Sequence, residues 1–540
     1  MKTSDTAGDE PHQDSPESFK DWYHSWRYLF WLLGLAGLVA SFYAEEDWRG
    51  QRAWSAYKEQ MTARGESFEP SAFIPPHVPD EENFAMTPAL SALFDFVPGT
   101  QHWRNSNAPS QFQSLGARYE AAARLVKPRT IASSNSWLRA HTDLGVWAAA
   151  FEAGTNVPAG EREPLLATNF SAQDAAAAVL RAMAEYDPVL DELREASRRP
   201  HSRFNIRYEQ DNPATILLPH LSKIKQFCLI LQLRASAEIA VGSTQDALKD
   251  IELMFYLTDT SRNEPILISH LVRMAELQLA LLPVAEGMGQ WSDPQLRALQ
   301  ERLQGFDFCA DSKRSLQAER TLFGNGVIEW VRHSPNKFHL IDQFEGSGPA
   351  SEGELWPVGV LMAVGPDGWL CLEQRNSSRA FDQYLLPLID VPNHRISPDA
   401  VRNSEDAITR LTQGSQSTRY LHHEFFSGLL LPAISRVGQK TAFAQTAVDT
   451  ATVACALQRY RLAHGHFPDS LEKLSPELIS KLPHDIINGE PLRYRLLPED
   501  KYLLYSVGWN QKDDGGFAQR NKTGDTQQQE GDWVWSNFWF

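Results

Sequence analysis

Histidine and acidic side chains come together at one place near the C-terminus. His464, His466 and Asp469 fall within six residues, and imidazole and carboxylate groups serve as acid–base groups and metal ligands. However, Gly465 marks the end of a helix between the two histidines, and a histidine at a helix C-terminus simply complements the helix dipole. We therefore favour a structural role for these side chains.

Other catalytic signatures are missing from the sequence. His422-His423-Glu424 has no second histidine at the helical spacing of a zinc protease. The GxSxG turn of serine hydrolases and the phosphate-binding patterns GxGxxG and GxxxxGK do not occur. A serine, a histidine and an aspartate can be picked from any chain of 540 residues, so their presence alone has no meaning. We predict that the protein is not an enzyme.

Tryptophans are a second candidate for a binding function. The chain has 16 of them, and Trp533, Trp535 and Trp539 lie at its end. Such rings could line a face that binds a sugar or a partner protein. The alternation Asp-Trp-Val-Trp is more typical of an edge strand with one face buried, so we expect these rings in the core.

The composition is that of a globular protein with more than one domain. At roughly 100–200 residues per domain, 540 residues predict two to four domains. Apolar residues make up 42% and charged residues 22%, which argues against wholesale disorder and against a polytopic membrane protein. The net charge of −17 disfavours a nucleic-acid partner. The four cysteines form no CxxC pair, so we expect buried free thiols.

One segment has the composition of a membrane span. Residues 28–44, YLFWLLGLAGLVASFYA, carry no charge and reach the short end of the range of about 17–25 residues for a spanning helix. Aromatic residues lie at both ends, as they do at membrane interfaces. A signal peptide or a buried core helix is less favoured, because the preceding tail is acidic and no small-residue cleavage site follows.

We therefore predict a disordered acidic tail over residues 1–27 and a single-pass anchor in the lipid bilayer over residues 28–44. Positive charge is not heavily biased, because Arg49, Arg52 and Lys58 follow the span at short range, but Arg27 lies directly against it on the N-terminal side, so we expect a cytoplasmic N-terminus. In a Gram-negative bacterium this would place the anchor in the inner (cytoplasmic) membrane and the bulk of the chain in the periplasm.

Prolines and helix-capping residues divide the rest of the chain. Residues 45–110 are Pro-rich, and we expect a stalk there because proline interrupts helices. Residues 111–436 alternate amphipathic segments with short turns, which predicts an irregular α-helical domain of helical hairpins, with a loop break over residues 333–354. The segment AEIAVGSTQDALKDIELMF resembles a tetratricopeptide hairpin, although no 34-residue repeat is present.

Individual helix ends can be predicted from capping residues. Ser171 and Ser292 are each followed three residues later by a side chain that can complete a cap, so each predicts a helix start. Gly242 and Gly465 predict helix ends. After the second of these glycines, PLRYRLL and KYLLYSVG read as paired strands, so we predict a small α+β domain over residues 437–540.

This C-terminal region resembles the globular head of type II secretion major pseudopilins. The resemblance rests on a long helix followed in order by Gly465-His466-Phe467-Pro468, Leu482-Pro483-His484-Asp485, Asn488-Gly489-Glu490-Pro491 and Ser506-Val507-Gly508-Trp509-Asn510. The layout of anchor, Pro-rich stalk, helical middle and pseudopilin-like tail also resembles large membrane proteins of the Planctomycetes–Verrucomicrobia type. Pseudopilins carry their hydrophobic helix directly before the head, whereas here it lies about 400 residues upstream. The resemblance thus implies a reused module rather than a pilus subunit.

The resemblance also implies a calcium site. The C-terminal loop of the pseudopilin head binds Ca²⁺, a hard cation that takes oxygen ligands. By motif match, Asn510, Asp513, Asp514 and Asp532 occupy the ligand positions. Asn510 stands where the family has an aspartate, and the loop is longer here. The alternative is a solvated Asp-Asp-Gly-Gly turn, with Asp532 merely starting a strand.

These features together predict a membrane-anchored interaction scaffold with protein partners, associated with a secretion or envelope machine. Helical hairpins commonly present binding surfaces, although this step is an analogy at the level of the fold. Two alternatives stay open. One is an enzyme with its site in a cleft of the helical domain, and the other is a minor pilus-like subunit.

Overall fold

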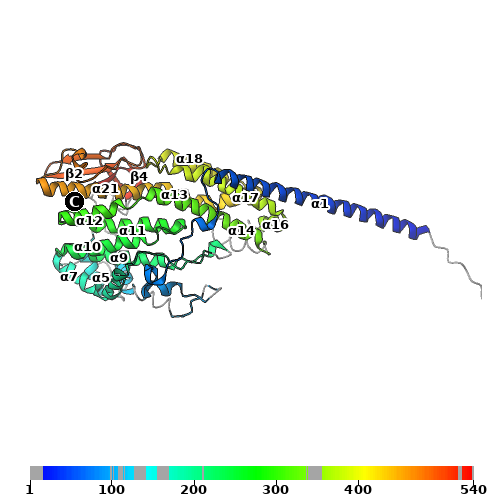
Figure 1. Cartoon of the computed structure of the whole chain (residues 1–540). Helices are drawn as coiled ribbons and strands as arrows, with labels where there is room; N and C mark the ends of the chain where they lie inside the picture. The colour runs from blue at the N-terminus through cyan, green and yellow to red at the C-terminus, as the bar shows by residue number, and fades with distance from the viewer. Residues whose placement is uncertain are drawn as a thin grey trace, which may run out of the picture.

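The protein is mainly helical, with one long N-terminal helix that projects from a helical body and a small sheet region near the C-terminus (Figure 1). This computed structural model describes residues 16–97, 100, 102–107, 114, 116–126, 142–154, 170–208, 212–335, 337, 356–520 and 526–537. Most of the predicted acidic tail and of the predicted loop break over residues 333–354 lies outside the described residues.

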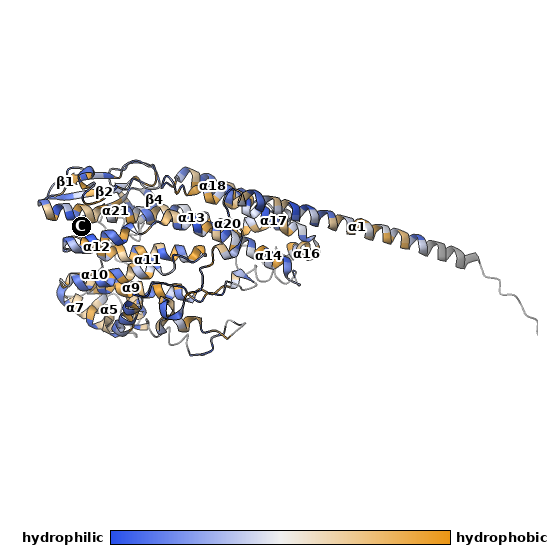
Figure 2. Cartoon of the chain, viewed as in Figure 1, coloured by the Kyte–Doolittle hydropathy of each residue, from blue (hydrophilic) through white to orange (hydrophobic). Residues whose placement is uncertain are grey.

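Helix α1 runs without interruption over Pro16–Thr62. Residues 16–27 are therefore helical and not disordered as predicted. The predicted anchor, residues 28–44, is the outer part of this longer helix, and the inner part, residues 45–62, continues the helix instead of beginning a stalk. The helix continues past the span because the chain makes its first left-handed turn only at Gly65, where φ is +89°. The outer part carries the apolar side chains and projects away from the body (Figure 2). By length and hydropathy it is a candidate membrane span, and none of its apolar window is buried.

Two other helices are long and apolar enough to cross a membrane, within residues 213–240 and 267–286. Half of the first apolar window, and 72% of the second, is buried inside the body. These helices contribute to the core of the body, and only α1 offers an apolar face with no protein against it among these three candidates.

The helical body is built from consecutive hairpins. Ser171 accepts a hydrogen bond from the backbone N–H of Asp174, and Ser292 forms a capping box with Gln295, so both predicted helix starts are confirmed. Gly242, with φ +84°, turns the chain between two helices that pack together. The first part of the body comprises α4 (Ala117–Leu125), α5 (Leu144–Ala153), α7 (Ala172–Met183), α8 (Asp187–Ala196), α9 (Pro219–Ala240), α10 (Thr244–Asp259), α11 (Leu267–Glu286), α12 (Asp293–Gln304), α13 (Phe308–Ala318) and α14 (Asn325–His333).

The second part of the body packs beside α1. It comprises α16 (Trp356–Val364), α17 (Asp367–Ala380), α18 (Pro398–Leu411), α19 (Gln416–Leu421) and α20 (Phe425–Ile434). Short π-helical segments follow α13 at Glu319–Gly324 and follow α17 at Phe381–Leu385. Helix α17 runs along the inner part of α1, which follows the apolar span toward the body (Figure 1).

The Pro-rich segment lies against the body and does not stand off from it as a stalk. Between its prolines the chain makes short 3₁₀ turns at Pro70–Ala72, Asp80–Glu82, Phe84–Met86 and Ala92–Phe94, with a four-residue helix, α2, at Pro88–Ser91. Phe84 and Leu90 are completely buried in the main hydrophobic core. Prolines stop a regular helix, but the apolar residues between them still pack.

Helix α21 (Val437–His464) is buried along most of its length and ends at Gly465, with φ +82°. It packs against α11, α12 and α13, and also contacts the sheet. Strands β1 (Arg493–Leu497), β2 (Lys501–Ser506) and β5 (Trp533–Ser536) form an antiparallel sheet in the order β1-β2-β5, and β3 (Ala518–Arg520) pairs with β4 (Thr526–Gly531).

One hydrophobic cluster extends from Phe84 through the helical body and α21 to Trp535. The C-terminal α+β region thus shares its core with the helical body. Trp533 and Trp535 are buried, and Trp533 packs edge-on against Phe443 of α21 with ring centroids 5.1 Å apart. The expectation that the rings belong to the core is confirmed for Trp533 and Trp535, with both faces of β5 buried instead of one, while Trp539 lies outside the described residues.

Candidate functional site

The residues of the predicted calcium site lie in the segment between β2 and β5. Nδ2 of Asn510 donates to Oδ2 of Asp514 at 2.8 Å, and the hydroxyl of Tyr505 donates to Oδ1 of Asp513 at 3.0 Å. Asp513 also lies 3.6 Å from the guanidinium of Arg493. The structure thus brings the first three predicted ligands together, and each has a polar partner of the protein itself.

Asp532 lies deeper in the same loop. Its two carboxylate oxygens accept the backbone N–H groups of Asp514 at 3.2 Å and of Gly516 at 2.7 Å. Burial raises the pKa of Asp532 to about 6. Across the described residues, the carboxylates of Asp513, Asp514 and Asp532 do not all lie within 4.8 Å of one another. The calcium site therefore stays a prediction.

The histidines near the end of α21 share one aromatic neighbour, since the rings of both lie against Tyr460. His464 stacks on Tyr460 with ring centroids 3.9 Å apart, and His466 makes a 2.9 Å contact through Nδ1 with the carbonyl oxygen of Phe467. Asp469 pairs with Lys473 at 2.8 Å. This arrangement agrees with the structural role that we favoured for the two histidines.

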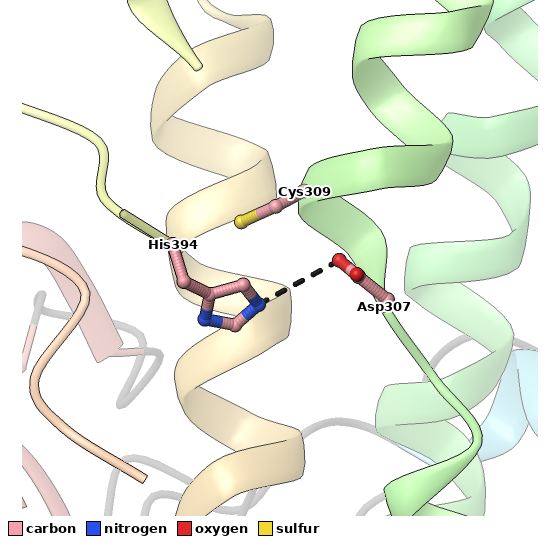
Figure 3. A group of neighbouring side chains, drawn as sticks. All are labelled: Asp307, Cys309 and His394. Atoms are coloured by element: carbon pink, nitrogen blue, oxygen red, sulfur yellow. Dashed lines mark ion pairs between the residues drawn. The ribbon is translucent and has the colours of Figure 1, made fainter. Parts of the chain in front are cut away.

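A different group of side chains converges at the start of α13. Asp307 caps this helix, where its Oδ1 accepts the backbone N–H of Ala310 at 2.9 Å, and Cys309 is in the first turn. His394 reaches the same place from the turn that precedes α18. The ligand atoms of Asp307, Cys309 and His394 all lie within 4.8 Å of one another (Figure 3). This is the one such group among the residues that the structure describes.

The group is buried on one side and open on the other. Cys309 is completely buried, while the side chains of Asp307 and His394 are 44% and 31% exposed. Nε2 of His394 lies 3.6 Å from Oδ1 of Asp307, which is too long for a hydrogen bond. The three side chains thus form a shallow site with sulfur at its base and nitrogen and oxygen at its rim.

The electrostatic environment of the group is acidic. Pairing with Asp307 raises the pKa of His394, and the buried carboxyl of Asp449 in α21 contributes to the same shift. Burial raises the pKa of the Cys309 thiol and raises that of Asp449 to about 7. His394 thus faces the carboxyls of both Asp307 and Asp449.

The backbone of the turn that carries His394 is strained. His394 has φ +48°, a left-handed conformation that is uncommon outside glycine and is found at functional sites. Nε2 of His484 contacts the carbonyl oxygens of Asn393 and His394 at 3.2 Å each, so the turn is held by the C-terminal region. The carboxylate of Asp390 accepts the backbone N–H of Asn393 at 3.2 Å.

Sequence reasoning missed this group because its signal is weak. Asp307 and Cys309 are only two residues apart, but an Asp-x-Cys pair has no specific meaning. His394 lies in the segment DVPNHRISPD, which reads only as a break between helices. The one local clue is Asp307, since an aspartate before a helix is a recognisable N-cap.

A cavity of about 540 Å³ lies beside the inner part of α1. Trp54 and Lys58 of α1 form one wall, and residues of the first π-helical segment, α14 and α17 form the other. Two of its charged groups pair with each other, since Oε2 of Glu329 lies 3.1 Å from Nε of Arg332, and the same oxygen accepts from Nε2 of Gln374 at 3.0 Å.

Comparison with known proteins adds no further assignment for either group of side chains. No protein-family model matches the chain, and neither a curated protein nor a solved structure matches it significantly.

Proposed function

We propose that the protein is a single-pass membrane protein whose helical body serves as an interaction scaffold at the membrane surface. The observation that carries this proposal is α1, a continuous helix whose outer part is apolar and unburied while its inner part packs on the body.

The outer part of α1 needs an apolar environment. Leu32, Leu35 and Leu38 are 62%, 60% and 68% exposed, and a continuous apolar surface of this kind is rarely left in water. At 1.5 Å per residue, the 17 uncharged positions span about 26 Å, close to the roughly 30 Å of a hydrocarbon core. A bilayer is the occupant that fits this length.

The body begins directly where the span ends. Phe42 packs edge-on against Trp369 with ring centroids 6.4 Å apart, and Nε1 of Trp369 donates to Oε2 of Glu46 at 2.9 Å. The backbone N–H of Gly368 donates to Oδ1 of Asp47 at 2.7 Å. No flexible linker separates this junction from the span, so α17 would lie at the membrane surface.

A buried arginine holds the segment that directly follows α1. Arg320 is completely buried, pairs with Glu66 at 2.8 Å and also pairs with Asp382. Its guanidinium lies 4.4 Å from the ring centroid of Phe68. A buried cation with two acidic partners and an aromatic ring strongly specifies one arrangement of these segments.

We further propose that the N-terminus lies in the cytoplasm and the body in the periplasm, anchored in the inner membrane. Arg27, directly before the span, supports this orientation, while Arg49, Arg52 and Lys58 follow the span at a greater distance. The proposed partners are proteins, and the pseudopilin-like motifs of residues 437–540 suggest a secretion or envelope machine, with Ca²⁺ as a ligand of the loop at Asn510, Asp513, Asp514 and Asp532.

Three experiments test this function. Alkaline carbonate extraction of membranes should leave the protein in the pellet, and protease added to spheroplasts should digest the body. Release by carbonate would contradict the anchor, and full protection of residues 45–540 would contradict the periplasmic placement. Cross-linking in native membranes should recover protein partners through peptides of residues 440–540. Recovery of no partner would contradict the scaffold.

A further inference from the structure

We propose that Asp307, Cys309 and His394 bind one zinc ion, with the fourth coordination position open to solvent. This inference is independent of the proposed scaffold function, since it concerns the body and not the anchor.

The first argument is the chemistry of the three side chains. Cysteine sulfur, histidine nitrogen and carboxylate oxygen are the three ligand types of protein zinc sites. The sulfur and nitrogen ligands disfavour Ca²⁺ and Mg²⁺, which take oxygen. A single histidine does not complete the two-histidine, one-carboxylate set of non-haem iron.

The second argument is the spacing of the ligand atoms. Zinc binds nitrogen and oxygen at about 2.0–2.2 Å and sulfur at about 2.3 Å, so ligands of one tetrahedral ion lie about 3.3–3.8 Å apart. Nε2 of His394 and Oδ1 of Asp307 are 3.6 Å apart, too far for a hydrogen bond but suitable for two ligands of one ion. Cys309 Sγ lies within 4.8 Å of both (Figure 3), so small rotations of its side chain complete the set.

The third argument is that each ligand is held by the fold before any ion binds. Asp307 is fixed by its capping hydrogen bond to α13, and the left-handed backbone of His394 is fixed by His484. Strain of this kind persists where the surrounding structure maintains it, and it clusters at ligand sites. The pattern is that of a preorganised site.

The last argument concerns access. The sulfur lies at the buried base, while the nitrogen and oxygen ligands reach solvent, so an ion can enter from the rim and keep an open position there. Three protein ligands with one open position are the pattern of reactive rather than purely structural zinc sites.

The test uses the full chain, purified in detergent and stripped of metal. Titration with Zn²⁺ against a chromogenic chelator should give one high-affinity ion per chain. Co²⁺ in place of Zn²⁺ should give the intense visible bands of a tetrahedral site and a near-ultraviolet band from the cysteine thiolate. Absence of stoichiometric binding, or Co²⁺ bound without the thiolate band, would overturn the proposal.

Two substitutions assign the ligands. C309S and H394N should each weaken Zn²⁺ binding at least about 100-fold, since loss of supporting residues alone costs about 10–100-fold. Asparagine adopts left-handed backbone readily, so H394N should preserve the turn. The matched controls are C371S, at another buried cysteine, and H466N.

The controls should bind Zn²⁺ with unchanged affinity. Unchanged affinity in both C309S and H394N, or an equal loss in C371S and H466N, would contradict the assignment. If C309S does not fold, as judged by circular dichroism, H394N and the Co²⁺ spectrum of the unmodified protein still decide the question.

Discussion

The outer part of α1 (residues 28–44) and its inner part (residues 45–62) are both helical, but they lie in opposite environments. A Cβ added at Gly37, in the outer part, would meet no atom within 4 Å. A Cβ at Gly50, in the inner part, would lie 2.0 Å from the carbonyl oxygen of Gly368 in α17. Local sequence makes both parts helical. The inner part packs against α17, whereas the outer part has no such neighbour and needs another apolar environment. The following four experiments test this contrast.

The largest effect is expected from placing charges in the outer part. Each lysine at the centre of a span costs about 2.5–3.5 kcal/mol for insertion, so L32K and L35K together should cost about 5–7 kcal/mol. The double variant should appear in the carbonate supernatant. Its body should unfold at the usual temperature, because the side chains of Leu32 and Leu35 are exposed and lie away from the body.

The control for this variant is W48K, at an exposed position of the inner part, which should stay in the membrane pellet. A double variant that also stays in the pellet would show that the outer part is held by something other than a bilayer.

Removing Arg320 should have the next largest effect, on the attachment of the inner part. R320A leaves the carboxylates of Glu66 and Asp382 without their buried cation, and breaking such a group typically costs about 3–5 kcal/mol of unfolding free energy. Urea unfolding measures this loss. R198A removes an exposed ion pair with Glu195 and should cost at most about 1 kcal/mol. Equal losses in the two variants would argue against the buried network.

The glycine contact between α1 and α17 gives a matched pair in one helix. G50L forces the helices apart and should lower the free energy of unfolding by about 1–3 kcal/mol. G37L, the same substitution in the outer part, should leave it unchanged, because that position has open space around it. Thermal unfolding in detergent compares the two. A more stable G50L would mean that the close approach of α1 and α17 is not formed.

The smallest effect concerns pH and the acid on the far side of α17. Glu373 is buried, accepts the backbone N–H groups of Phe425 and Phe426 at 3.0 and 3.2 Å, and burial raises its pKa to about 8. The unfolded pKa is about 4.3, so between these values only the folded state holds the proton. Stability should therefore fall as the pH rises through this window.

For Glu373 the loss from pH 6 to pH 7 should be about 1 kcal/mol. Urea unfolding at the two pH values should show a smaller slope in E373Q than in the unmodified protein. E195Q, at an exposed glutamate, should keep the full slope. An E373Q variant with an unchanged slope would mean that Glu373 is ionised in the folded protein.

Much of the local structure could be predicted from the sequence. The starts after Ser171 and Ser292, and the long helix that ends at Gly465, agree with the structure because capping depends on hydrogen bonds within a few residues. The paired strands 493–497 and 501–506 were recognisable from their alternation and short turn.

The predictions of a stalk and of a separate C-terminal domain depended on long-range contacts, which cannot be read from a local sequence pattern. The Pro-rich segment packs because Phe84 and Leu90 find partners in helices far along the chain. Helix α21 joins the C-terminal region to the body because all of its faces are covered. A sequence shows that a residue is apolar but not which surface covers it.

The sequence by itself determined the apolar span, the helix caps, the excess of negative charge and the residues of the 510–532 loop, because each depends on composition or on near neighbours. Only the tertiary structure decided that α1 continues into the body and that Asp307, Cys309 and His394 meet. The physical reason is that these side chains are brought together by the packing of α13, α21 and the turn before α18, and the geometry of such packing is set by the whole core.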